Sequence, residues 1–175
     1  MKQKLFFFLC GFLALGMAAC AQAAPVKLYG YAQVVIPGAA PRGDIAEGGQ
    51  RLPAADYRRW NYFIYLDNGS GKRVYPLELW IGGKRQGVTF TEVDSTPVTQ
   101  VNRNITRNPR TVTLVPKTTG KVLQLTPATE PEKKATARAA RLATENELVL
   151  VYRMGGKTHY RVVQKMERLE PLALP

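Results

Sequence analysis

The sequence predicts an all-β domain with one short helix, built as an antiparallel β-sandwich of about eight strands, immunoglobulin-like or similar. Three observations lead to this prediction. Several short segments alternate apolar and polar residues, paired glycines at 82–83 and 155–156 separate some of them, and only residues 130–144 have a helical pattern. Short strands joined by such turns are typical of sandwiches and, as an alternative, of barrels. The Cys-Trp-Cys signature of true immunoglobulin domains is absent.

The first residues have the order of a secretory signal peptide. Lys2 and Lys4 precede an apolar run over residues 5–17, and small residues follow it. The run is shorter than the ~20 residues of a membrane-spanning helix. No second candidate span follows, so we expect an exported mature chain without a transmembrane segment.

Two processing sites fit this leader. Cleavage after Ala23 would remove residues 1–23 and leave a single domain at 24–175. The alternative is a bacterial lipoprotein, in which residues 1–19 are removed and Cys20 is acylated. We therefore expect a periplasmic or secreted protein, or alternatively an outer-membrane lipoprotein anchored through Cys20.

Both cysteines, Cys10 and Cys20, belong to the leader. A disulfide framework, a thiolate metal site and a catalytic cysteine are therefore excluded from the mature domain. His159 is the only histidine, which also excludes zinc sites built on two or three histidines. We expect neither a metal nor a cofactor.

The chain is strongly basic: 25 Lys and Arg residues against 13 Asp and Glu residues give a formal net charge of +12. The polyanions that an exported protein meets are lipopolysaccharide, anionic lipid headgroups and acidic glycans, and not nucleic acid. The alternative is a basic surface that only keeps the protein soluble.

The first strand is predicted at residues 26–36, with Gly30 as a sign of a bulge, and Pro37 ends it. Residues 37–56 are rich in proline and glycine. We expect a flexible loop there, because little in this segment could pack.

Residues 59–93 are expected to form a meander of three strands. If a turn at residues 68–71 pairs Asp67 with Lys72, and Gly82-Gly83 pairs Ile81 with Lys84, both turns place the same residues on one face. This predicted core face comprises Trp60, Tyr62, Ile64, Tyr75, Leu77, Leu79, Val88 and Phe90. Pro76 has no amide hydrogen and indicates a bulge, or a backbone nitrogen that points away from the ladder.

The opposite face of this meander is the candidate binding surface. Phe63, Tyr65 and Trp80 lie on it, and Trp80 is expected between Arg59 and Arg85, where a guanidinium can lie over its ring. An exposed aromatic patch with arginines is typical of a contact site. The alternative is that the helix or a second sheet covers this face and makes it core.

A further hairpin is expected from residues 111–115 and 121–125, after a polar connection at 94–108 that holds one short strand. The helix near 130–144 is predicted to begin at a capping box from Thr129 to Glu132. Its basic face comprises Lys134, Arg138 and Arg141. Its alanine-rich face suits docking onto a sheet better than insertion into a membrane surface, which needs larger apolar side chains.

The last hairpin is predicted from residues 148–153 and 158–163. The Gly155-Gly156 turn pairs Met154 with Lys157 and places His159 opposite Tyr152, where a structural role is expected. The strand at 148–153 is apolar on both faces, so we expect it to be central.

The sequence has no catalytic constellation, and we do not expect an enzyme. The carboxylates of Glu78 with Glu92 or Asp94 form the one alternative, a small glycan hydrolase, which needs a carboxyl pair ~5 to 9.5 Å apart. The function expected first is a noncatalytic binding or scaffolding module of the bacterial cell envelope. Its partner would be another envelope protein or an anionic polymer or lipid, with binding to lipopolysaccharide or glycan as a named alternative.

Overall fold

The computed structural model describes residues 26–36, 59–102, 110–129 and 135–173. Several sequence predictions fall outside these residues: the signal peptide at 1–23 with Cys20, the loop at 37–56, and Lys134 of the basic helix face.

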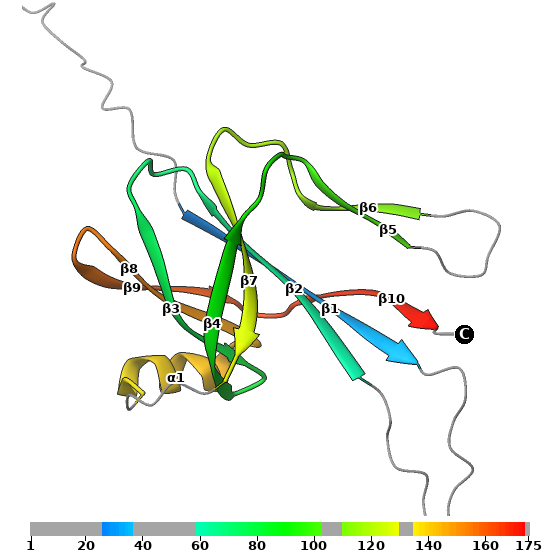
Figure 1. Ribbon diagram of the computed structural model, residues 1–175. Coiled ribbons are helices and arrows are strands. Elements are labelled where there is room, and N and C mark those ends of the chain that lie inside the picture. Colours follow the sequence, from blue (N-terminus) through cyan, green and yellow to red (C-terminus); the bar gives the residue numbers. More distant parts are fainter. Residues whose placement is uncertain (1–25, 37–58, 103–109, 130–134, 174–175) are drawn as a thin grey trace, which may run out of the picture.

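The described residues form ten strands and one helix, α1, which spans Ala137–Glu145 (Figure 1). The strands are β1 (Val26–Ile36), β2 (Arg59–Asn68), β3 (Val74–Ile81), β4 (Lys84–Glu92), β5 (Val98–Asn102), β6 (Arg110–Val115), β7 (Lys121–Ala128), β8 (Leu148–Met154), β9 (Lys157–Val163) and β10 (Glu167–Ala173). The all-β class with one short helix is confirmed.

Eight of the strands form one sheet in the order β10-β1-β2-β7-β4-β3-β8-β9, and β5 and β6 form a separate two-stranded hairpin. The sheet curls into a half-barrel, so the described residues do not form a clear sandwich. Nor is the sheet wholly antiparallel, because β1 pairs with β10 in parallel. The curl brings β9 back to β1, where Arg161 Nε donates to the carbonyl oxygen of Val26 at 2.8 Å. One sheet thereby encloses most of its own apolar face.

The strand order within the predicted meander is wrong. β2 pairs with β1 and β7, whereas β3 pairs with β4 and β8. The apolar residues of β2 find their partners on β7, where Ile64 pairs with Leu125 and Leu66 with Leu123. The predicted hairpin of residues 111–115 and 121–125 is also wrong, since β6 pairs with β5. Hydrophobic alternation does not specify which strand lies beside which. The predicted core face is also wrong in part, because Trp60, Tyr75 and Leu77 are 40–44% exposed. The bulge after Pro76 turns Tyr75 away from the interior, and Val74 is buried there instead.

The two glycine-pair turns are confirmed. Ile81 pairs with Lys84 and Met154 with Lys157, and all four glycines have positive φ angles between 55° and 77°. Pro76 marks a bulge, as predicted, because the register of β3 against β8 shifts between Pro76 and Glu78. β8 lies between β3 and β9 and so has a neighbour on each side, but it is next to the edge of the sheet and not at its centre.

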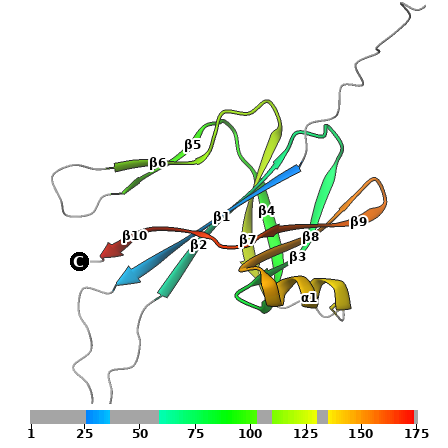
Figure 2. The same ribbon diagram turned by 180° about the vertical axis from the view of Figure 1, so that it is seen from behind.

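Apolar side chains gather in three clusters. The largest fills the concave interior and includes Ile64, Leu79, Leu125, Leu150 and Tyr152. A second lies between β1, β2 and β7 and the β5–β6 hairpin, and a third lies beneath α1. Figure 2 shows the hairpin and the helix at well-separated places on the sheet.

Gly30 marks a close approach and not a bulge. Its register with Ile64 on β2 is continuous, but a Cβ atom there would stand 2.6 Å from Leu148 Cδ2 and 3.2 Å from Met166 Cγ. The missing side chain lets β8 and the segment before β10 pack against β1.

α1 begins later than the capping box predicted. Thr136 is the N-cap, and its hydroxyl accepts from the amide of Ala139 at 3.2 Å. Thr129 instead extends the pairing of β4 with β7, since its carbonyl accepts from the amide of Gly87 at 2.9 Å. Docking through small residues is confirmed, with Ala139 and Ala143 buried against β8. No helix in the described part of the chain is long and apolar enough to cross a membrane.

Candidate functional site

One end of the half-barrel is formed by the start of β1 and three turns, and we call this end the mouth. Across the sheet, Val26 pairs with Asn68, and Asn68 pairs with Lys121. On the other side of the opening, Val74 pairs with Met154. Figure 1 shows the β2–β3, β6–β7 and β8–β9 turns on this side of the sheet and α1 at the opposite end.

The β2–β3 turn crosses the opening because β7 and β4 lie between β2 and β3 in the sheet. Its shape is set by Asn68, whose amide donates to the carbonyl of Lys72 at 2.6 Å and whose Oδ1 accepts from Ser70 Oγ at 2.6 Å. Ser70 Oγ also contacts Met154 Sδ at 3.4 Å, which ties the turn to β8. Gly71 has a φ of 69°, which suits glycine at this bend.

The β6–β7 turn packs closely against the end of β2. Thr118 Oγ1 donates to Oδ1 of the buried Asp67 at 3.2 Å and accepts from the amide of Gly120 at 3.1 Å. A Cβ atom on residue 120 would stand 2.5 Å from Asp67 Oδ1, so only glycine fits there. Both turns therefore have defined shapes at the mouth.

A groove of about 610 Å³ lies between these turns, and we call it the mouth groove. Its apolar floor is made by Val74, Phe90 and Leu123. Val74 and Leu123 are buried members of the interior cluster, whereas the side chain of Phe90 is 44% exposed. The groove therefore gives access to apolar surface continuous with the interior of the half-barrel.

The rim of the mouth groove is cationic. Lys72, Arg73 and Lys121 line it, and Glu92 is its one carboxylate among the lining residues described. Lys121 Nζ contacts Glu92 Oε1 at 3.0 Å in an exposed ion pair. Among the described residues, no carboxylate lies within ion-pair distance of Lys72, so its charge is available to an anion. The Arg73 guanidinium lies over the Tyr75 ring at 4.9 Å. A cationic rim above an apolar floor suits a ligand with an anionic head and an apolar body.

The predicted aromatic face is not assembled. Phe63 and Tyr65 lie in the cluster beneath the β5–β6 hairpin, whereas Trp80 lies beneath α1. Tyr65 and Trp80 are buried, and burial raises the pKa of Tyr65. Tyr65 and Trp80 are therefore covered core residues and do not form an exposed contact surface.

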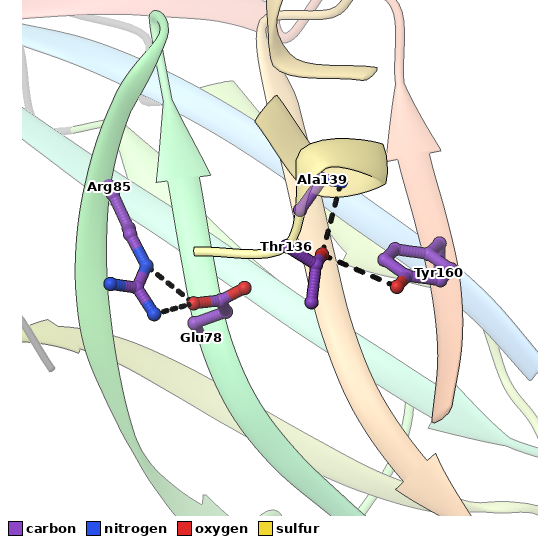
Figure 3. Close-up of polar contacts among 5 residues, drawn as sticks. All are labelled: Glu78, Arg85, Thr136, Ala139 and Tyr160. Atoms are coloured by element: carbon purple, nitrogen blue, oxygen red, sulfur yellow. Dashed lines mark hydrogen bonds and ion pairs between the residues drawn. The ribbon is translucent and has the colours of Figure 1, made fainter. Parts of the chain in front are cut away.

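The two arginines of that predicted surface also separate. Arg59 is exposed on β2, opposite Val35 of β1, and far in the sheet order from Trp80 of β3. Arg85 does pair with Trp80 across the β3–β4 turn, as predicted. Its guanidinium lies against Glu78, with Nε and Nη2 each 2.5 Å from Oε2 (Figure 3).

The carboxylates of the hydrolase alternative are held apart. Glu78 pairs with Arg85 and Glu92 pairs with Lys121. Arg85 and Glu92 are seven residues apart on β4, roughly 20 Å of strand length. Asp94 is exposed beyond the end of β4, on the side of Glu92. The structure therefore does not bring Glu78 together with either proposed partner.

The remaining predicted residues have structural surroundings. His159 lies opposite Tyr152 as predicted, with ring centroids 5.4 Å apart and an interplanar angle of 23°. Arg138 and Arg141 are exposed on α1, and the Arg138 guanidinium lies over the Tyr160 ring at 4.8 Å. Within the described ranges, no group of three His, Cys, Asp or Glu residues could hold a metal ion.

The residues of the mouth groove were not singled out from the sequence. Phe90 is on the predicted core face, because the turn at 82–83 was expected to place it opposite Tyr75, whereas it pairs with Leu125 of β7. The signal that could have found the groove is the sequence Lys72-Arg73 directly after the glycine-rich turn at 68–71. Its significance depends on the strand order, which brings Lys121 and Phe90 beside it.

Comparison with protein-family models, with curated proteins and with solved structures found no match to this chain.

Proposed function

We propose that this protein is an exported, noncatalytic binding protein of the bacterial cell envelope, and that it holds an anionic amphiphile in the mouth groove. The observation that carries the proposal is the pairing of a cationic rim, made by Lys72 and Lys121, with an apolar floor centred on Phe90. The ligand class is an acyl or similarly apolar body with a phosphate or carboxylate head.

Size and chemistry support this assignment. Small-molecule sites commonly enclose roughly 300–1,000 Å³, and the groove of about 610 Å³ falls within that range. An ammonium group on the rim would bind the head by charge-assisted hydrogen bonds. The glycine-rich turns at residues 69–71 and 120 leave backbone close to the same space.

The sequence supports the proposed localisation. The leader at residues 1–23 predicts export, and the formal charge of +12 favours anionic partners. We propose a periplasmic or secreted protein, or alternatively an outer-membrane lipoprotein acylated at Cys20.

Binding of two matched lipids tests the proposal. The full mature chain is titrated with lysophosphatidylglycerol, which is anionic, and with lysophosphatidylcholine, which is zwitterionic, both as monomers. We expect tighter binding of the anionic lipid by about tenfold, because the basic rim repels the choline cation of the zwitterionic lipid and both lipids carry the same phosphate. This preference should fall as the salt concentration is raised.

Two variants locate the site. Lys72→Glu should abolish the preference for the anionic lipid, and Phe90→Ser should weaken binding of both lipids. Lys84→Glu is the matched control, since Lys84 is exposed at the β3–β4 turn, at the opposite end of β3. An equal loss in Lys72→Glu and Lys84→Glu would show a net-charge effect and overturn the proposed site.

A further inference from the structure

A second cationic surface lies on the convex side of the sheet, outside the mouth groove. It runs across β3, β8 and β9 to α1, and it comprises Arg73, Tyr75, Arg138, Arg153 and Tyr160, which we call the arginine-tyrosine strip. Only Arg73 also lines the groove.

Strand register places these side chains on one face. Tyr75 pairs with Arg153, and Arg153 pairs with Thr158. Tyr152 and Val74, the preceding residues on β8 and β3, point into the interior cluster, so Arg153 and Tyr75 point outward. Tyr160 follows two residues after Thr158 and therefore shares this outward face.

Two arginines lie over the two tyrosine rings. The Arg73 guanidinium is 4.9 Å from the centroid of Tyr75, and the Arg138 guanidinium is 4.8 Å from the centroid of Tyr160. Tyr160 is further positioned by its hydroxyl, which is 3.4 Å from Thr136 Oγ1 at the start of α1 (Figure 3). Each pair presents a flat ring together with a guanidinium.

The two arginine-tyrosine pairs lie a short distance apart on this face. Tyr75 and Tyr160 are separated by two strand spacings and by two residues along the strand, roughly 12 Å between Cα atoms. Arg153 lies between them and is exposed. Among the described residues, no carboxylate forms an ion pair with Arg73, Arg138 or Arg153, so the strip carries uncompensated positive charge.

We infer that the arginine-tyrosine strip binds a linear acidic polysaccharide. Such a polymer offers sugar rings that stack on tyrosine and carboxylates that pair with guanidinium groups, at repeated positions along a line. An anionic membrane surface fits less well, because the strip presents tyrosine and arginine and no Trp, Phe or Leu to insert between lipids.

Binding to polygalacturonate tests this inference. The mature chain should be retained on immobilised polygalacturonate and not on uncharged dextran. Arg138→Gln/Arg153→Gln should weaken retention by about tenfold or more, one charge-assisted contact being worth about that ratio. The control Arg59→Gln/Lys165→Gln removes the same two charges from exposed residues outside the strip and should keep the affinity. Tyr75→Ala should weaken binding, whereas Tyr75→Phe retains the ring and should not.

Several outcomes would overturn the inference. These are absence of retention on polygalacturonate, an equal loss in both double variants, or binding to phosphatidylglycerol vesicles without binding to the polymer. The proposal for the strip can be wrong while the proposal for the mouth groove is right, because Arg138→Gln/Arg153→Gln leaves every groove residue in place. Binding of lysophosphatidylglycerol by that variant should therefore be unchanged.

Discussion

Gly30 of β1 lies directly against Leu148 of β8, and a Cβ atom on residue 30 would stand 2.6 Å from Leu148 Cδ2. Leu148 is fully buried, so it has little space into which to move. This contact is one of the points at which the curled sheet packs against its own first strand.

Gly30→Val should therefore destabilise the fold by about 1–3 kcal/mol, the cost of overpacking a dense core. Urea unfolding measures the change. Lys27→Val, an exposed position on the same strand, is the control and should have a small effect. Adding Leu148→Ala to Gly30→Val should cost less than the two single changes summed, because it removes the clashing methyl groups. Strict additivity would contradict the contact.

Glu78 and Arg85 form an ion pair whose side chains are only 8% and 11% exposed. Glu78→Gln should remove the carboxylate charge that faces Arg85 in this mostly buried pair and cost about 3–5 kcal/mol. Glu92→Gln breaks the Lys121 pair, whose side chains are 73% and 56% exposed, and should cost about 0–1 kcal/mol. The free energies of unfolding of the two variants give the comparison, and similar values would contradict the difference in burial.

The two tryptophans report on the docking of α1. Trp80 is buried beneath the helix, whereas Trp60 is 44% exposed with Arg168 over its ring. Trp60→Phe should keep a blue-shifted emission that acrylamide quenches poorly, and Trp80→Phe should keep a red-shifted, readily quenched emission. Equal quenching in the two variants would mean that α1 does not cover Trp80.

Tyr31 links the sheet to the β5–β6 hairpin, since its hydroxyl donates to the carbonyl of Leu114 at 2.7 Å. Burial, and then the nearby Glu167, raise the pKa of Tyr31 above 10.0. The folded state therefore favours the neutral phenol. The stabilisation of the fold by this group is complete below the unfolded-state pKa of about 10, and it is lost as pH rises through the higher folded-state pKa. Stability should fall in the alkaline range.

Urea unfolding at a series of alkaline pH values checks this sign. Tyr31→Phe should be less stable than the wild type near neutral pH, because it lacks the hydrogen bond, and its stability should fall less with rising pH. Burial also raises the pKa values of Tyr65 and Tyr152, so the stability of the variant should still fall in part as pH rises. A wild type and variant with the same slope would contradict the role of Tyr31.

Local patterns predicted local structure well. The register of Met154 with Lys157, the turn at 82–83 and the bulge at Pro76 all depend on residues close together in the chain. The limits of β1 also match the predicted strand, because Pro37 stands at its end. β10 was missed, since a short segment with charges and a proline has little alternation to detect.

The candidate site could not be predicted because it depends on contacts between distant segments. Phe90 and Leu123 meet the Lys72-Arg73 turn only because β7 and β4 lie between β2 and β3. The aromatic face failed for the same reason, as Tyr65 and Trp80 belong to strands separated in the sheet. An apolar face does not specify its neighbour, so several strand orders satisfy the same alternation.

The most direct test of the account is a map of the chemical shifts that lysophosphatidylglycerol changes. In the isotope-labelled protein, titration should shift the amides of Gly71 and Gly120 and the methyl groups of Val74 and Leu123, which line the mouth groove. Ala139 and Ala143 beneath α1 should not shift. Saturable shifts confined to the groove are the predicted result. Shifts centred elsewhere, or none at all, would contradict the claim that the mouth groove binds anionic amphiphiles.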